Sequence, residues 1–145
     1  MNIIKEIPSK ETHIVRQPVL RKGKPIETCI FEGDDLEDTH HFGFYKNNHL
    51  TGIISLFSKI NPTFAAKKQG QIRGMAVLEE YQKQGIGDVL VKHCEDFCIK
   101  NDVRLIWFNA RTAAVGFYKK LNYQIVGEAF DIKDVGEHYL MYKEL

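Results

Sequence analysis

One stretch of the sequence, from Gln71 to Gly87, constrains the fold more than any other. Its first half ends on the apolar run Met75–Val77, which predicts a strand, and its second half carries two glycines, Gly85 and Gly87. Apolar residues at helical spacing follow as far as Lys100. A glycine-containing turn that opens a helix leaves several backbone N–H groups without partners, and the helix dipole reinforces them. The stretch therefore predicts a site for an anion, most often a phosphate.

The composition limits the class of protein. The 145 residues are enough for one domain with its own hydrophobic core, which we expect to span residues 1–145. A formal net charge of +1 argues against non-specific binding of nucleic acid. The apolar runs are too short to cross a bilayer, and no signal-peptide pattern is present, so we expect no membrane association. Three cysteines without the spacing of a disulfide framework are typical of the reducing cytoplasm.

The order of the expected elements predicts an α/β fold, with a mixed sheet of six or seven strands and helices on its faces. Pro18 is expected to kink the first helix or to end it early. The turn at Asn47-Asn48 predicts a hairpin, because asparagine tolerates a positive φ. The predicted strands are 1–7, 42–45, 50–57, 71–77, 103–108, 123–130 and 138–142, and the predicted helices are 10–21, 87–100 and 112–121.

The glycine turn does not match two common nucleotide-binding loops, although a purely structural turn also explains two glycines. A dinucleotide-binding loop needs a third glycine three residues after the second, where this chain has Leu90. A P-loop needs Gly-Lys-Ser/Thr, whereas Asp88 follows Gly87. The pattern Gln82-x-x-Gly85-x-Gly87 instead resembles the acyl-CoA pyrophosphate loop of the GCN5-related N-acetyltransferases (GNAT).

A second block strengthens this resemblance. Asn109 closes an apolar strand, Phe117 and Tyr118 follow on the next predicted helix, and Leu121-Asn122-Tyr123 comes after them. The family has glycine where this chain has Asn122, which is the non-glycine residue that best tolerates a positive φ. With both blocks in order, the chain is identified as a member of the GNAT superfamily over residues 71–145. The resemblance implies a sheet in which the two central parallel strands splay apart.

The resemblance also implies a set of residues that bind acetyl-CoA as co-substrate. The strand before the turn would bind the pantetheine arm through its backbone, and the turn would hold the pyrophosphate through its amides. Asn109 would bond the arm, and the Tyr118 hydroxyl would lie near the thioester sulfur. The implied residues are Met75, Ala76 and Val77 on the strand, Gln82, Lys83, Gln84, Gly85, Ile86, Gly87 and Asp88 in the turn, and Asn109 and Tyr118 beyond it.

Acyl transfer to an amine needs a polarised carbonyl, a proton for the departing thiolate and a neutral amine. The N–H of Val77 can polarise the carbonyl, and the Tyr118 phenol can protonate the thiolate. The base that deprotonates the amine stays open between His138, Glu128 and a water chain. A strand histidine without a catalytic role and a solvated carboxylate are the alternatives for these two residues.

The predicted activity is transfer of the acetyl group of acetyl-CoA to a primary amine by direct attack in a ternary complex. Cys94 and Cys98 lie on the apolar stripe of their helix, which predicts buried thiols rather than nucleophiles. The alternative from another class is a catalytically silent acyl-CoA sensor or interaction module, and a weaker one is a different phosphorylated ligand. Small amines, polyamines, amino sugars and peptide amines all stay open as acceptors. A homodimer through sheet edges is an analogy with the architecture.

Two further features have two interpretations each. The acidic segment with Asp34, Asp35 and Asp38 precedes His40 and His41, but the order lacks the spacing of a metal site, so no metal is expected. A solvated acidic loop, which can attract a cationic amine, is the interpretation that we favour. Lys67, Lys68 and Arg73 either meet the 3′-phosphate of the cofactor or form a solvated face.

Overall fold

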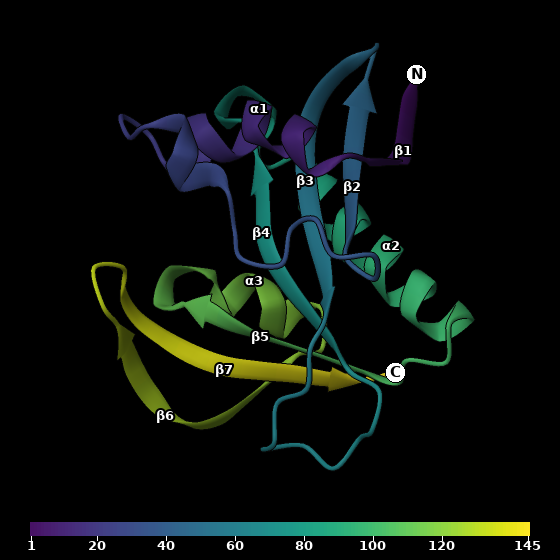
Figure 1. Cartoon of the computed structure of the whole chain (residues 1–145), viewed down its shortest axis with the longest axis vertical. Coiled ribbons are helices and arrows are strands. Elements are labelled where there is room, and N and C mark those ends of the chain that lie inside the picture. The colour runs from purple at the N-terminus through teal and green to yellow at the C-terminus, as the bar shows by residue number, and fades with distance from the viewer.

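A computed structural model describes residues 1–145, which form one seven-stranded mixed sheet with helices on both faces (Figure 1). The strand order is β1-β2-β3-β4-β5-β7-β6, and only β4 and β5 pair in parallel. This confirms the predicted fold class and the order of the elements. The strands are β1 (Asn2–Ile7), β2 (His40–Lys46), β3 (His49–Ser58), β4 (Gly70–Val77), β5 (Leu105–Arg111), β6 (Gln124–Ile132) and β7 (Gly136–Glu144). The helices are α1 (Ser9–Leu20), α2 (Ile86–Lys100) and α3 (Val115–Lys120), with short 3-10 turns η1 (Ile26–Cys29), η2 (Glu79–Tyr81) and η3 (Thr112–Ala114).

The two central parallel strands separate soon after they begin. β4 and β5 pair only through Gly70 with Ile106 and Gln71 with Trp107. Beyond this point Figure 1 shows β4 running towards the top and β5 towards the left, so that a gap opens between them. The facing edges of both strands keep unpaired backbone groups there. The predicted splay between the central strands is confirmed.

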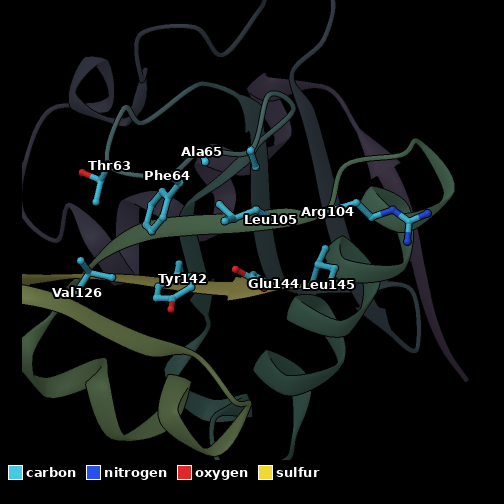
Figure 2. A pocket seen from close by; sticks show the side chains of 10 residues that line it. Thr63, Phe64, Ala65, Arg104, Leu105, Val126, Tyr142, Glu144 and Leu145 are labelled. Atoms are coloured by element: carbon cyan, nitrogen blue, oxygen red, sulfur yellow. The ribbon is translucent and has the colours of Figure 1, made fainter.

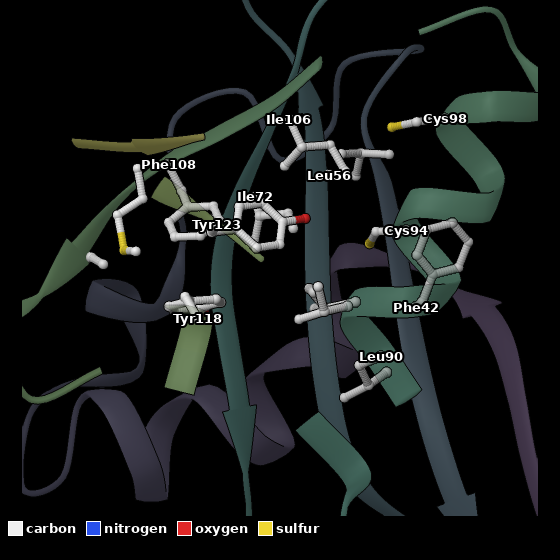
Figure 3. Close-up of a cluster of buried hydrophobic side chains, with 14 of the residues drawn as sticks. Phe42, Leu56, Ile72, Leu90, Cys94, Cys98, Ile106, Phe108, Tyr118 and Tyr123 are labelled. Atoms are coloured by element: carbon white, nitrogen blue, oxygen red, sulfur yellow. The ribbon is translucent and has the colours of Figure 1, made fainter. Parts of the chain in front are cut away.

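The main hydrophobic core fills the space between the sheet and the helices α2 and α3. Leu90, Cys94 and Cys98 of α2 point at the strands in Figure 3, and Tyr118 of α3 lies near Phe108 of β5. The buried face of α2 follows from its apolar spacing, which is the pattern of a helix that packs on a sheet. This packing fixes where α2 and α3 begin relative to the gap between β4 and β5.

The opposite face of the sheet is covered by α1. Val15 of α1 packs with Ile53 of β3 and Ala76 of β4 in a second, smaller core cluster. Pro18 lies inside α1, which continues to Leu20, so of the two expected effects, a kink or an early end, the early end is excluded. Pro18 removes one helical hydrogen bond only two residues before the helix ends. None of the helices is long and apolar enough to cross a membrane.

The acidic segment before β2 is not a solvated loop throughout. Asp34 is buried and pairs with the fully buried Arg16, with 2.6 Å between Oδ2 and Nη1. His41 is buried too, and its ring nitrogens lie 2.6 Å from the Ser55 hydroxyl and 2.8 Å from the Asp34 carbonyl oxygen. The interpretation as a solvated loop was therefore wrong for Asp34 and His41, because a buried arginine from α1 supplies the countercharge.

Candidate active site

The turn between β4 and α2 presents backbone N–H groups at the start of a helix. Gly85 is the N-cap of α2, with a φ of 84°, and no side chain caps the helix. Lys83 is also left-handed, with a φ of 62°. The amides of the first helical turn have no partner within the helix, and turns with left-handed residues gather amides into a concavity. The turn therefore has the backbone geometry that an anion needs.

Two glutamines of the turn are occupied by contacts within the chain. Gln82 Nε2 donates to the carbonyl oxygen of Val77 at 2.9 Å, which ties the turn to the end of β4. Lys46 Nζ donates to Gln84 Oε1 at 2.9 Å. The side chains of Lys83 and Asp88 are exposed. Gln82 therefore shapes the turn, and the backbone amides are what the turn offers to a ligand.

The two glycines of the turn are needed for different reasons. A Cβ on Gly85 would meet no atom within 4 Å, so its positive φ is what requires glycine there. A Cβ on Gly87 would lie 3.1 Å from Cζ of Phe117 and 3.5 Å from Cε of Met75. Gly87 therefore lets the start of α2 approach α3 and β4 closely. The sequence predicted only an anion-binding turn for these glycines and missed this packing role.

Beyond the point where β4 and β5 separate lies a cleft of about 580 Å³. This volume is in the range of small-molecule sites. Of the predicted site residues, the cleft brings together Met75 of β4, Asn109 of β5, Tyr118 of α3 and His138 of β7. The other predicted residues of β4 and of the turn follow Met75 along the chain as far as the start of α2.

The edge of β4 that faces the gap is available for hydrogen bonds. Leu78 donates its N–H to the Thr51 carbonyl oxygen at 2.8 Å, towards β3. Because successive residues of a strand alternate, the N–H of Val77 points away from β3 and towards the gap. Farther back, Gly74 and Met75 together lie opposite the single residue Ile54, and Gly74 has a φ of 64°. This bulge bends β4 where it borders the cleft.

Tyr118 lines the cleft from the side of α2 and α3. Its ring packs on Phe108 with 4.2 Å between the ring centroids, and the residue is 7% exposed. Burial raises the pKa of Tyr118, and the nearby Cys94 raises it further. The phenol is therefore protonated at neutral pH and can donate a hydrogen bond or a proton into the cleft.

His138 lines the cleft, and one of its two ring nitrogens forms a hydrogen bond within the chain. Its Nδ1 lies 2.7 Å from the carbonyl oxygen of Gly136. A carbonyl oxygen can only accept, so Nδ1 carries the hydrogen and Nε2 keeps a free lone pair. His138 pairs in register with Arg111 of β5 and is 4% exposed. This tautomer is the one that a proton acceptor requires.

Glu128, the other candidate base, does not line the cleft. It is exposed on β6, next to Gly127, whose φ is 76°. The register of β6 with β7 shifts between Val126 and Phe130, so Glu128 lies in an irregular part of the strand. The structure brings Tyr118 and His138 together and leaves Glu128 apart.

The cleft passes through the sheet from one face to the other. Phe108 and Tyr118 belong to the core under α2 and α3. Asn109 and Arg111 alternate with Phe108 along β5, so their side chains belong to the opposite face, and His138 pairs with Arg111 on that face. A donor molecule and an acceptor can therefore approach from opposite faces and meet in the gap.

The two cysteines of α2 lie outside the cleft. Cys94 and Cys98 are both fully buried in the core, which confirms the prediction from their spacing. Burial raises the pKa of the Cys94 thiol well above its ordinary value and that of Cys98 to about 12. Neither thiol is therefore available as a nucleophile.

Several cleft residues were missed by the sequence analysis, Phe31 and Arg111 among them, and Arg73 has another place than predicted. Phe31 comes from the segment after η1, where the sequence has no helical or strand periodicity. Arg111 follows the strand that the motif with Asn109 identified. Arg73 is half-buried on the cleft wall and not part of a solvated face. A glycine inside a strand signals a bulge, so Gly74 was the sequence feature that could have identified this wall.

A second hollow, shown in Figure 2, lies near the start of β5 and the end of β7. Its volume is about 520 Å³. It shares no residue with the cleft and contains neither a histidine nor a cysteine, so it is not a second candidate for the chemistry. Its walls are Thr63, Phe64, Ala65, Ala66, Arg104, Leu105, Val126, Tyr142, Glu144 and Leu145.

Comparisons with known proteins agree with this geometry. The model of the acetyltransferase (GNAT) family matches residues 7–123. An uncharacterized N-acetyltransferase of Bacillus subtilis (strain 168), YitI, is 35% identical over 142 residues, which cover 98% of this chain and 95% of the relative. The sequence match thus extends over the cleft, the turn and all three helices.

Solved structures share the fold at low sequence identity. An aminoglycoside 6′-N-acetyltransferase complexed with coenzyme A has a TM-score of 0.78 at 15% identity, covering 98% of this chain and 96% of that one. Ard1 from Thermoplasma volcanium has a TM-score of 0.77 at 17% identity, covering 99% and 97%. These structures show the shared fold, and the family model and the Bacillus subtilis relative show that the chain belongs to the GNAT family of acetyltransferases.

Proposed function

We propose that the protein transfers the acetyl group of acetyl-CoA to a primary amine by direct attack in a ternary complex. The observation that carries the proposal is the cleft between β4 and β5. Met75 links the cleft to the uncapped start of α2, because a Cβ on Gly87 would lie 3.5 Å from Met75 Cε, and Tyr118 and His138 line the cleft from opposite faces of the sheet. Binding of the donor on one face leaves the other face for the acceptor.

The chain offers a separate binding element to each part of acetyl-CoA. The unpaired edge of β4 from Met75 to Val77 can bond the amides of the pantetheine arm as an added strand would. The amides from Gln84 to Asp88 suit the pyrophosphate, because they lie at the start of α2 with no side-chain cap. Asn109 lines the same cleft and can bond the arm from the β5 side.

In this proposal His138 and Tyr118 divide the proton transfers. His138 Nε2 takes the proton from the attacking amine, while the amine nitrogen bonds to the acetyl carbon and the carbon–sulfur bond breaks. Tyr118 then gives its proton to the thiolate, and the two residues exchange protons with solvent. The N–H of Val77, which points towards the gap, is the proposed donor to the carbonyl oxygen, and Met75 lines the cleft two residues before it on the same strand.

A route through an acetylated cysteine is disfavoured by the positions of the thiols. Cys29, Cys94 and Cys98 are all buried, and none of them lines the cleft. A ping-pong reaction would need one of them to reach the donor and then the acceptor. Direct attack by the amine needs no such movement.

Release of free thiol from acetyl-CoA over a panel of amines is the measurement that tests the activity. Turnover with at least one amine, together with a rise in melting temperature on adding CoA, is the expected result. The alternative function is a silent acyl-CoA sensor, which would show the same rise in melting temperature and no thiol release from any amine. Absence of a response to CoA would refute both functions.

A further inference from the structure

The acceptor side of the cleft carries an excess of positive charge. Four cationic side chains line it. They are Arg21 after the end of α1, Lys59 after the end of β3, Arg73 of β4 and Arg111 of β5. The only carboxylate that lines the cleft is Glu32. The formal net charge of the whole chain is +1, so this excess is a local feature.

Arg73 is the cation that is built most deeply into the wall. Its guanidinium carbon lies 5.0 Å from the ring centroid of Phe31 and 5.2 Å from that of Phe57. It is half-buried and forms no ion pair within the chain. Burial lowers the pKa of Arg73. Cations that are removed from water in proteins are generally paired, so a half-buried arginine without an ion pair in a cleft wall is suited to bind an anion from outside the chain.

The nearest buried carboxylate is not free to serve Arg73. Asp34 accepts hydrogen bonds from Arg16 Nη1 at 2.6 Å, from Arg16 Nη2 at 3.1 Å and from the Phe31 N–H at 2.8 Å. Arg16 fixes Phe31 as well, since its guanidinium lies 3.8 Å from the Phe31 ring centroid. The network thus holds one wall of the Arg73 site rigid without neutralising it.

A second unsatisfied donor lies behind the same wall. Nε of Arg16 is the only buried side-chain nitrogen or oxygen of the chain without a hydrogen-bond partner. A Cβ on Gly74 would be 3.4 Å from it, and Gly74 lines the cleft. Arg111 forms no ion pair either, and it lies opposite His138 across the β5–β7 pairing. The positive charge therefore surrounds the place where the amine must approach His138.

We propose that the acceptor amine carries an anionic group, a carboxylate or a phosphate, and that Arg73 binds this group with help from Arg111. The inference rests on the proposed function, because it assigns the acceptor half of the same cleft. Arg73 and Met75 are separated only by the bulge at Gly74, and both line the cleft. The anionic group is thus a short chain away from the amine, as in an amino acid or a small aminoalkyl phosphate. Polyamines and other polycationic amines are disfavoured, because they would bring further positive charge beside the unpaired arginines.

Paired amines that differ only in the charged group test this inference. The carboxylate arm compares glycine with glycinamide and glutamate with glutamine, and the phosphate arm compares O-phosphoethanolamine with ethanolamine. Thiol release from acetyl-CoA gives kcat/KM for each, and spermidine represents the polycations. We expect a preference for the anionic member of about 10-fold to 100-fold, as charge-assisted hydrogen bonds typically give. Arg73→Met should bring this ratio towards one without changing the KM for acetyl-CoA.

A binding measurement separates the failure of this inference from the failure of the proposed function. In the presence of CoA, N-acetylglycine should raise the melting temperature more than N-acetylglycinamide, and Arg73→Met should remove the difference. The matched control is Arg104→Met, because Arg104 is an exposed arginine that pairs with Asp102 at the far end of β5. It should behave as the wild type.

Each outcome decides one of the two proposals. Preference in either arm supports an anionic acceptor and tells which group is recognised. Equal or better use of the neutral amines or of spermidine by the wild-type protein overturns the inference, whether or not the Arg73 variant folds. If no amine releases thiol, the melting-temperature measurement still decides whether the cleft prefers an anion. It uses the N-acetylated probe pair and its phosphate counterparts, N-acetyl-O-phosphoethanolamine and N-acetylethanolamine. The proposed activity would then fail on its own.

Discussion

Replacing Asp34 by asparagine removes the only countercharge of a fully buried arginine. Arg16 has a side-chain exposure of 0% and Asp34 one of 3%, and asparagine is nearly the same shape as aspartate. After the substitution, the Arg16 guanidinium stays in the interior with a neutral partner. Loss of one member of a buried ion pair typically costs about 3–5 kcal/mol, because the remaining charge is uncompensated.

Because of the other contacts of Arg16, we expect a loss in the free energy of unfolding at the lower end of this range. Arg16 keeps its bonds to the Cys29 carbonyl oxygen at 2.8 Å and to the Ser55 hydroxyl at 3.0 Å. An asparagine oxygen in the place of Oδ2 can retain the bonds from Arg16 Nη1 and the Phe31 N–H, but the NH₂ group in the place of Oδ1 cannot accept from Arg16 Nη2. We therefore expect a loss of about 3 kcal/mol, which for a chain of this length lowers the melting temperature by about 10 °C.

Urea unfolding of the wild type and of Asp34→Asn measures the difference directly. Asp38→Asn is the matched control, because Asp38 belongs to the same acidic segment but is exposed, and it should stay within about 0.5 kcal/mol of the wild type. If Asp34→Asn also unfolds within 1 kcal/mol of the wild type, the Arg16–Asp34 pair is not a buried charge pair and the reasoning fails.

The same pair makes a prediction for the pH dependence of stability. Burial alone would raise the pKa of Asp34, but the hydrogen bonds from Arg16 and Phe31 and the charge of Arg16 outweigh it and hold the pKa below its ordinary value of 3.8. Folding therefore favours the ionised form. The stabilisation is fully present above the unfolded pKa and is lost as the pH falls below 3.8 through the folded pKa. The acid-side slope of the free energy of unfolding should be smaller in Asp34→Asn than in the wild type.

Four other substitutions address the chemistry, the turn and the core. Tyr118→Phe should lower kcat by about 100-fold or more and leave the CoA-induced rise in melting temperature unchanged, and equal turnover would remove the phenol from the mechanism. Gly85→Ala should lower the free energy of unfolding by about 1 kcal/mol, because the residue has a positive φ. Gly87→Val should displace Phe117 and weaken the response to CoA. Similar effects of both substitutions on CoA binding would contradict the different roles of the two glycines. Glu95→Gln should cost about 2 kcal/mol in urea unfolding, because Glu95 Oε2 accepts from Tyr123 and Lys143 at 3.0 Å each, and a neutral effect would show that neither bond stabilises the fold.

The donor half of the cleft could be predicted from the sequence because its parts are contiguous. A strand, a turn and the start of a helix follow one another within Gln71 to Gly87, so local spacing is enough to place the free amides. Asn122 is a similar case, since its φ of 72° is the positive value that its place in the motif predicted. Backbone recognition depends on few side chains, which is why a short pattern carries it.

The acceptor half could not be predicted because its parts meet only in the folded chain. Arg16 contacts Asp34 and Ser55 across 18 and 39 positions of the sequence. In the sequence, Asp34 belongs to a run of acidic residues that looks solvated, and nothing in the run marks the one carboxylate that turns inward. Glu128 shows the converse, because a local bulge in β6 removes a plausible carboxylate from the cleft.

The division between the two halves of the cleft has a consequence for specificity. The donor half binds through the backbone of β4 and the start of α2, so substitutions that keep the turn and its packing leave the donor unchanged. The acceptor half is defined by Arg73, Phe31 and Arg111, which stand on three separate segments. Arg73 lies near two rings and forms no ion pair with Asp34, whose carboxylate accepts from Arg16 and the Phe31 N–H instead. A substitution that freed Asp34 would neutralise Arg73 from within, and the anion preference should then weaken even though no residue that touches the acceptor has changed.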